Sequence, residues 1–130
     1  MVVDTSAWLC ILLNEPDATR YAEVLAMADT LLLSSVSYVE LGIVISSRHG
    51  AAGLERADRL LLALGAETIP FDRSQAAAAL SVWQRYGKGN HPARLNFGDC
   101  CTYALAKLRD TPLLYKGEDF AQTDIRSALS

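Results

Sequence analysis

The sequence predicts a three-layer α/β/α sandwich built around a central parallel sheet. Short apolar runs of strand length recur along the chain, and apolar residues between them repeat at the spacing of helix faces. An alternation of strands and helices favours a parallel sheet that carries helices on both faces. At 130 residues the chain is most simply one domain, covering residues 1–130.

Each element of this fold has its own signal. Four short apolar runs are expected to form the strands, at residues 2–3, 31–33, 67–69 and 113–115. Apolar stripes at helical spacing predict helices through residues 21–28, 54–64, 76–83 and 101–108. Gly50 and Gly65 stand where two of the helices should end.

Composition indicates an ordinary globular protein of the cytoplasm. The longest uncharged apolar run, Ala7 to Leu13, is too short to span a bilayer, so no membrane association is expected. Asp4 precedes that run without any cation, which argues against a secretory signal. The three cysteines include the adjacent Cys100 and Cys101 and lack the spacing of a metal site. We expect them to be small buried residues in a reducing cytoplasm.

The distribution of charge is more informative than the net charge of −3. Residues 73–98 contain four cations and no acid, whereas Glu118, Asp119 and Asp124 crowd the C-terminal segment. A basic segment beside an acidic site would suit a polyanionic substrate that also needs a metal. A solvated helix face followed by a loop explains the same distribution.

Acidic residues follow the predicted strands. Asp4 comes directly after the first strand, and the second strand leads through Ser34–Ser37 to Glu40. Asp99 opens the helix that feeds the last strand, and Asp119 lies four residues beyond the end of that strand. Ligands of open parallel sheets bind outside the carboxyl ends of the strands. We therefore expect these four acids to converge at one edge of the domain.

Each acid also has a structural explanation. Asp4 could cap the following helix, and Ser37 with Glu40 fits a capping box. Asp99 lies three residues after Asn96 and would favour the first turn of a helix. Asp119 could be a turn residue after Gly117, and Asp72 is interpreted as a turn residue as well.

The joint pattern favours a metal site. Several carboxylates in one place repel each other unless they are partly protonated or bridged by a cation. Oxygen ligands without a Cys/His cluster indicate Mg²⁺ or Mn²⁺. The hydroxyls of Thr5 and Ser6 could hold Asp4 in place or donate to a phosphate, with helix capping as the alternative. The glycine-rich phosphate loops and the G-x-S-x-G nucleophile motif are missing from the sequence.

Five blocks of the sequence, in order and with family-like spacing, resemble PIN domains. They are Val2–Ala7, Leu12–Pro16, Ser34–Glu40, Asn96–Cys100 and Leu114–Phe120. Among PIN domains the chain most resembles VapC, the toxin half of bacterial VapBC toxin–antitoxin pairs. The resemblance implies a Mg²⁺- or Mn²⁺-dependent endoribonuclease that is restrained by a cognate VapB-type antitoxin. It also implies homodimers and hetero-oligomers with that antitoxin.

The resemblance further implies roles for the acids. Asp4, Glu40, Asp99 and Asp119 would form the acidic centre. Asp4 and Asp99 would be direct metal ligands, whereas Glu40 and Asp119 would act through waters or a second ion. Asp124 is a candidate further member, with the capping of a short terminal helix as its alternative. Glu118 departs from the Asp or Asn that often precedes the fourth acid, and it could be an ordinary surface residue.

Recognition of RNA would fall to the basic segment and its neighbours. Lys88, Arg94 and Lys116 are candidates for guiding the RNA backbone, and Tyr86 or His91 for stacking on a base. Exposed single-stranded loops are the RNA features that proteins most often recognise.

The first two helices offer a surface for the antitoxin. Leu9, Leu12 and Leu13 on the first, and Tyr21 and Leu25 on the second, are interpreted as exceeding the needs of the core. They would form a groove for an antitoxin helix, with burial in the core as the alternative.

Two other classes of function remain open. A phosphatase-like α/β domain with an aspartate nucleophile would usually carry a second acid two residues after the first, where this chain has Ser6. A non-cleaving module could bind RNA or antitoxin while its acids served as helix caps. Metal-dependent cleavage of RNA separates this binding module from a nuclease.

Overall fold

The computed structural model describes residues 1–129 and is centred on a four-stranded, entirely parallel sheet. The strands are β1 (Val2–Val3), β2 (Leu32–Ser34), β3 (Glu67–Ile69) and β4 (Leu113–Leu114), in the order β3-β2-β1-β4. All four predicted strands are therefore confirmed, with ends that differ by one residue at most. The first strand of the chain is central in the sheet, which places the residue after it in the middle of the sheet edge.

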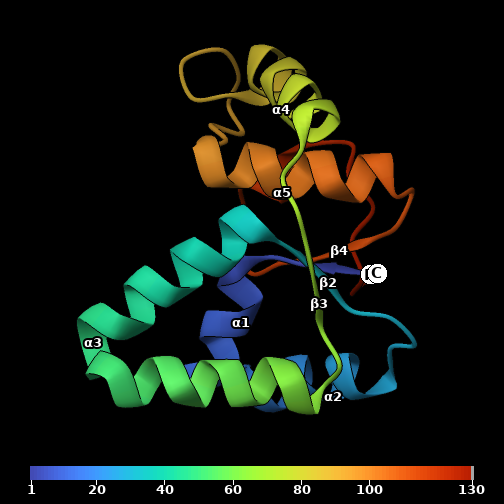
Figure 1. Cartoon of the computed structure of the whole chain (residues 1–130). Helices are drawn as coiled ribbons and strands as arrows, with labels where there is room; N and C mark the ends of the chain where they lie inside the picture. The colour runs from blue at the N-terminus through green and yellow to red at the C-terminus, as the bar shows by residue number, and fades with distance from the viewer. Residues whose placement is uncertain (130) are drawn as a thin grey trace.

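The helices form the two outer layers (Figure 1), and the predicted three-layer fold is confirmed. On one face α5 (Phe97–Leu108) packs against the strands, and α4 (Arg73–Tyr86) packs against α5. The other face carries α1 (Thr5–Leu12), α2 (Ala18–Met27) and α3 (Ser35–Ala63). A short 3-10 helix, η1 (Phe120–Gln122), follows β4.

The strands alternate their side chains between two hydrophobic clusters. The α5 side of the sheet receives Val2, Leu32 and Leu113, and the opposite side receives Val3, Leu33 and Leu114. All six side chains are buried. Strands buried on both faces are expected in a parallel sheet covered by helices, and they explain the uninterrupted apolar runs in the sequence.

Helix α3 bends sharply at Gly50. As predicted, the first helical stretch ends there, and a second one follows the bend directly and runs to Ala63, so that the two together make α3 (Figure 1). Gly50 has φ 63° and ψ −157°, a conformation that only glycine adopts without strain. The two limbs approach closely at Gly53, where an added Cβ would lie 2.6 Å from the Cβ of His49. Gly65, with φ 68°, follows the end of α3 as predicted.

Two helix starts differ from the sequence interpretation. Ser34 caps α3 by accepting a 3.1 Å hydrogen bond from the Val36 N–H, so the predicted capping box of Ser37 and Glu40 is wrong. Ser37 lies inside the helix, and the Glu40 carboxylate is free to face another element. Asp72 is more than a turn residue, since it caps α4 with a 2.9 Å hydrogen bond from Gln75 N–H.

The cysteines behave as small apolar residues. Cys10, Cys100 and Cys101 are buried and unpaired, as predicted. Burial raises the pKa of both Cys100 and Cys101 to about 11, which keeps these thiols protonated. Among residues 1–129, no helix combines the length and the apolar character needed to cross a membrane.

Replacing Gly50 with alanine should destabilise the protein. Nothing surrounds the position at which a Cβ would be added, so the cost is backbone strain of about 1–3 kcal/mol. The measurement is chemical denaturation of Gly50→Ala beside Gly42→Ala, a helical glycine whose added Cβ meets only Leu54 at 3.6 Å. The control should be unchanged or slightly more stable. Equal stability of the two variants would contradict the role of Gly50.

Candidate active site

Three of the four predicted acids line one pocket at the carboxyl ends of the strands. The pocket has a volume of about 400 Å³ and contains Asp4, Glu40 and Asp99. The remaining lining residues are Thr5, Ser6, Leu9, Ile43 and Val44. The pocket therefore has one acidic side and one apolar side, and it opens where a parallel sheet is expected to bind its ligand.

Asp4 is both a helix cap and a member of this pocket. Its carboxylate Oδ2 accepts hydrogen bonds from the Ser6 backbone N–H at 3.0 Å and from the Ser6 Oγ at 2.6 Å. Its own backbone N–H donates to the Leu114 carbonyl at 2.9 Å, which ties the end of β1 to β4. Only 5% of the residue is exposed. Burial raises the pKa of Asp4, and the hydrogen bonds from Ser6 act in the opposite direction.

Glu40 reaches the pocket from the second turn of α3. The Thr5 Oγ1 lies 3.3 Å from the Glu40 Oε1 and donates a hydrogen bond to it. The carboxylate packs directly against Gly98 at the start of α5, where an added Cβ would come within 2.6 Å of Glu40 Cδ. Burial, followed by the nearby charge of Asp4, raises the pKa of Glu40. Gly98 thus makes room for an acid from another helix.

Asp99 is held by a reciprocal capping box at the start of α5. The Asn96 Oδ1 accepts from the Asp99 N–H at 2.8 Å, and the Asp99 Oδ2 accepts from the Asn96 N–H at 3.1 Å. The pKa of Asp99 is raised to about 7, mainly by burial. The charges of Asp4, Asp119 and Glu40 raise it further, while the Asn96 N–H acts to lower it.

Asp119 lies at the margin of the site. It is exposed at the position before η1, makes no capping hydrogen bond, and is close enough for its charge to act on Asp99. It does not line the pocket with the other three acids. Glu118 is exposed, as an ordinary surface residue would be.

Asp124 lies in a different cluster, and neither interpretation from the sequence describes it. Its carboxylate accepts a short hydrogen bond from the Tyr103 hydroxyl and lies 3.2 Å from the Lys107 ammonium and 3.6 Å from the Arg85 guanidinium. The hydrogen bond from Tyr103, followed by that from Lys107, lowers the pKa of Asp124. Because its partners are cations of α4 and α5, Asp124 anchors the C-terminal segment.

Two residues that support the site were not predicted from the sequence. Thr102 is fully buried, its hydroxyl lies 3.0 Å from the Ser37 hydroxyl, and it acts to lower the pKa of Asp4. It follows Asp99 by three residues and therefore shares the same face of α5. Gly98 is the other, and the signal that could have found it is a glycine inside the first turn of a helix, directly before an acid.

The predicted RNA-contacting residues fall into two groups. Lys88 and Arg94 are exposed in the loop between α4 and α5, where they line an open hollow of about 480 Å³. Neither side chain has an ion-pair partner within residues 1–129. Lys116, in contrast, places its ammonium 2.7 Å from the Glu15 carboxylate. Its charge is therefore already paired.

The two candidate stacking residues are used inside the protein. Tyr86 is 6% exposed and packs between His91 and Tyr103, so it cannot stack on a base. The His91 ring contacts Tyr86 edge-on, and its Nδ1 accepts a 3.0 Å hydrogen bond from the Ala93 N–H. The prediction for Tyr86 was wrong because the fold buries its ring, whereas base stacking by the half-buried His91 stays a prediction.

The predicted antitoxin groove is only partly available. Tyr21 and Leu25 are 5% and 2% exposed and belong to the core, so the interpretation of those two residues was wrong. Leu9, Leu12 and Leu13 are only partly buried at the edge of the same core cluster.

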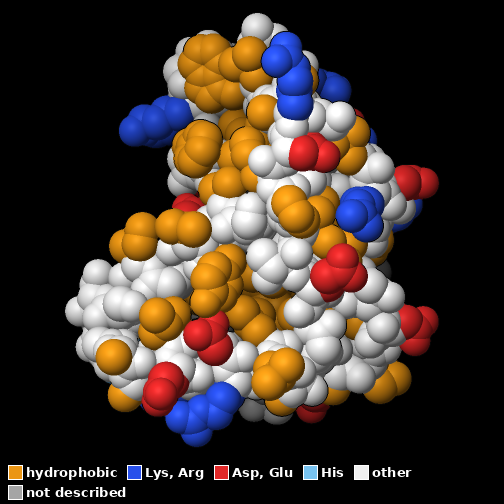
Figure 2. All heavy atoms as spheres, in the orientation of Figure 1, with side chains coloured by type: hydrophobic (Ala, Val, Ile, Leu, Met, Phe, Trp, Pro, Cys, Tyr) orange, Lys and Arg blue, Asp and Glu red, His pale blue; other side chains and the backbone are white. Residues whose placement is uncertain are grey.

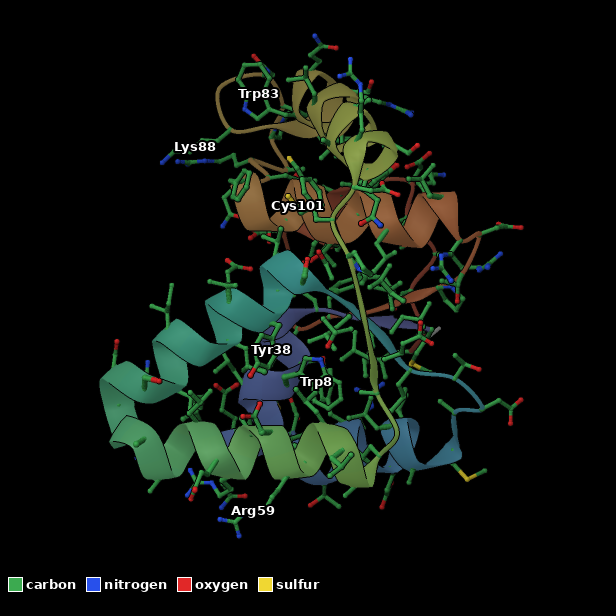
Figure 3. All side chains as sticks on the ribbon, viewed as in Figure 1. Trp8, Tyr38, Arg59, Trp83, Lys88 and Cys101 are labelled. Atoms are coloured by element: carbon green, nitrogen blue, oxygen red, sulfur yellow. The ribbon has the colours of Figure 1, made fainter. Side chains whose placement is uncertain are left out.

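A second groove, of about 710 Å³, is apolar and separate from the acids. It lies between α4 and the start of α5, and Leu80, Trp83 and Phe97 line it while remaining 59%, 44% and 72% exposed. Figure 2 shows side chains of this kind gathered over the α4–α5 layer, and Figure 3 places Trp83 beside Lys88 there. No Asp, Glu or Tyr side chain lines this groove, so it is not the site at which the acids could act.

The chemistry of the acidic pocket fits a hard divalent cation. Within residues 1–129, no group of three or more His, Cys, Asp or Glu side chains is arranged so that it could hold a metal ion as it stands. Mg²⁺ does not need such a cage, because it keeps several waters and often binds through one or two carboxylates. The buried Asp4 and the half-buried Asp99 supply carboxylates with raised pKa values, and a cation would offset the charge that they gain on ionisation.

Comparison with known proteins identifies the family of the chain. The PIN domain family model matches residues 1–126. The chain is 46% identical to a ribonuclease VapC of Mycolicibacterium smegmatis, covering 96% of this chain and 97% of that protein. The chain belongs to the PIN domain family. Within it, ribonuclease VapC28 of Mycobacterium tuberculosis is 45% identical over 99% of this chain and 98% of its own length.

Solved structures with much lower sequence identity share the fold. The chain superposes on VapC20 of Mycobacterium tuberculosis, described as a toxin that cleaves the sarcin–ricin loop, with a TM-score of 0.79 over 95% of both chains. It superposes on a toxin–antitoxin complex from Klebsiella pneumoniae with a TM-score of 0.72 over 95% and 92% of the chains. Sequence identities of 16% and 19% support the shared fold alone.

Replacing Gly98 with alanine should lower the rate of RNA cleavage and leave the stability of the protein almost unchanged. The new methyl group would displace the Glu40 carboxylate, and misplacement by about 1 Å can reduce a rate on the order of 10²-fold. Stability should change by less than about 1 kcal/mol, because alanine favours the helix and the displaced group ends a flexible side chain. Cleavage rate and melting temperature should be measured together, with Gly42→Ala as the control. An unchanged rate would contradict the contact.

The Asp99 carboxylate should make the metal-free protein less stable as pH rises. Between the ordinary pKa of 3.8 and the folded value of about 7, the unfolded chain ionises while the folded protein keeps the proton. Stability is lost across that interval. Asp99→Asn, which keeps the capping acceptor, should therefore be about 1–2 kcal/mol more stable than the parent at pH 8 in EDTA, after allowance for partial exposure.

The same comparison at pH 4 serves as the internal control. Parent and Asp99→Asn should there differ much less in their free energies of unfolding, because Asp99 keeps its proton in the folded chain and is still close to half protonated in the unfolded chain, whose pKa is 3.8. A stability difference that does not change between pH 4 and pH 8 would show that Asp99 is not responsible.

Proposed function

We propose that this protein is a Mg²⁺- or Mn²⁺-dependent endoribonuclease, the toxin of a toxin–antitoxin pair, restrained by a cognate VapB-type antitoxin. The observation that carries this proposal is the convergence of Asp4, Glu40 and Asp99 in one pocket of a PIN domain. Relatives that are 43% and 46% identical over nearly the whole chain are ribonucleases of the VapC type. The cytoplasm, where RNA and a reducing environment coincide, is the proposed location.

Asp4 and Asp99 are the proposed ligands of the metal. The chemistry that such an ion supplies when bound is activation of a water and neutralisation of charge on a phosphodiester. Glu40 and Asp119 complete the acidic centre, through waters or a second ion. Asp119 is exposed and not part of the pocket wall, which suits an indirect role.

The protein's own residues contribute positioning. Ser6 fixes the Asp4 carboxylate, and the capping box with Asn96 fixes Asp99. Rigidly held acids of this kind need little reorganisation when the substrate reacts, which is a major source of catalytic power. Because the pKa of Asp99 is about 7 in the metal-free protein, Asp99 has to give up its proton when it binds the metal.

The substrate and the partners follow from the same proposal. Lys88 and Arg94 are the proposed contacts to the RNA backbone, since both are exposed and carry unpaired charge in the described structure. The antitoxin is proposed because VapC relatives lie so close in sequence and because a toxin–antitoxin complex from Klebsiella pneumoniae shares the fold. Homodimers and hetero-oligomers with the antitoxin remain predictions.

Metal-dependent cleavage of RNA tests the proposal directly. Purified, antitoxin-free protein should cut a structured RNA mixture with Mg²⁺ or Mn²⁺ and lose activity in EDTA. Asp4→Asn and Asp99→Asn should each reduce the rate on the order of 10²-fold or more, because each removes a charge that the metal requires. Asp72→Asn is the matched control, since Asp72 caps α4 after β3 and lies outside the pocket.

Two outcomes would count against this function. Variants that cut as well as the parent would show that the acids are not catalytic and that the activity has another source. Folded parent protein that binds Mn²⁺ and RNA without cutting would favour the non-cleaving binding module.

A further inference from the structure

The segment that leaves β4 is fastened to α1 and α2 by side-chain hydrogen bonds. The Tyr21 hydroxyl donates to the Tyr115 carbonyl at 2.9 Å. The Lys116 backbone N–H donates to the Ser6 Oγ at 3.0 Å, and the Lys116 ammonium donates to the Glu15 Oε1 at 2.7 Å. This segment leads directly to Asp119, so its fastening bears on the acidic centre.

The Lys116 ammonium lies close to three side chains from the end of α1 and the turn after it. Besides Glu15 it lies 3.9 Å from the Asp17 carboxylate and 3.9 Å from the Cys10 sulfur. The side chains of Lys116 and Glu15 are 30% and 36% exposed, so the pair is partly withdrawn from solvent. Glu15 and Asp17 belong to the turn between α1 and α2, and that turn is thereby joined to a residue 101 positions further along the chain.

A continuous chain of contacts runs from this ion pair to Asp4. The Ser6 hydroxyl accepts from the Lys116 N–H and therefore directs its single proton to the Asp4 Oδ2, 2.6 Å away. Immediately after Lys116, Gly117 adopts φ 106° and redirects the backbone toward Asp119. The position of the Lys116 backbone therefore determines the orientation of the Ser6 hydroxyl. It also determines the point from which the chain continues to Asp119.

We propose that Glu15 and Lys116 form a clasp that positions Asp4 and Asp119 for the metal. This inference rests on the proposed function, and it assigns Lys116 to the shape of the metal site in place of RNA binding. Exposed ion pairs contribute little to stability, so the effect of the clasp should appear in metal affinity. Groups that orient metal ligands typically alter affinity 10- to 100-fold when they are removed.

The test measures Mn²⁺ binding to metal-free protein by isothermal titration, with no RNA present. Glu15→Gln and Lys116→Gln should each weaken binding by roughly 10-fold. The double variant should be no weaker than the single variants, because both remove the same ion pair. Lys116→Arg, which keeps the charge, should restore affinity to within about 3-fold of the parent.

Arg59→Gln provides the matched control for loss of an ion pair. Arg59 pairs with Glu55 at 3.5 Å on the outer surface of α3, and Figure 3 shows it pointing away from the body of the protein. Its affinity for Mn²⁺ should equal that of the parent. Melting curves of every variant, recorded in EDTA, establish that each protein is folded during the titration.

Several results would overturn the clasp. Unchanged Mn²⁺ affinity in Glu15→Gln and Lys116→Gln would do so, whether or not their melting temperatures fell. Weakened RNA binding by Lys116→Gln with normal Mn²⁺ affinity would return Lys116 to a direct RNA contact. Failure of the parent itself to bind Mn²⁺ would overturn the proposed function together with the clasp, and the parent's own titration distinguishes that case.

Discussion

Burial of the Asp4 carboxylate at the end of a central strand is the constraint on which the site depends. The side chain is 5% exposed, and a buried carboxylate needs hydrogen-bond donors or a cation. Ser6 supplies two donors, and Thr102 on α5 acts with them to lower the pKa of Asp4. Burial raises the pKa values of Asp99 and Glu40, and the charges of the neighbouring acids raise them further.

Much of this arrangement can be predicted from the sequence, because the fold is dictated by short-range patterns. The strands β1, β2 and β4 are fully buried, and parallel strands bring the residues that follow them to one edge. Asp4, Glu40 and Asp99 can therefore be grouped from the sequence alone. The capping box of Asn96 and Asp99 can also be predicted from the sequence, because both partners lie within one helical turn.

The errors share a physical cause, which is that residue type does not reveal a distant partner. The pairing of Lys116 with Glu15, 101 positions earlier, likewise cannot be predicted from the type of either residue. Tyr86 has a ring that could stack on a base, but the fold buries it against Tyr103. At the start of α3 two serines compete as caps, and Ser34 prevails because it ends β2 and is buried there.

The sequence leaves helix capping and catalysis as alternative roles for each acid. In the structure, Asp4 and Asp99 accept capping hydrogen bonds and also line the acidic pocket. A capping hydrogen bond comes from a rigid backbone N–H, so it fixes the orientation of the carboxylate without an extra supporting side chain. One oxygen of Asp4 is used in this way, which leaves the other for a cation. Preorganisation of that kind is what a metal-dependent site requires of its ligands. The structural role of the acids therefore supports the functional one.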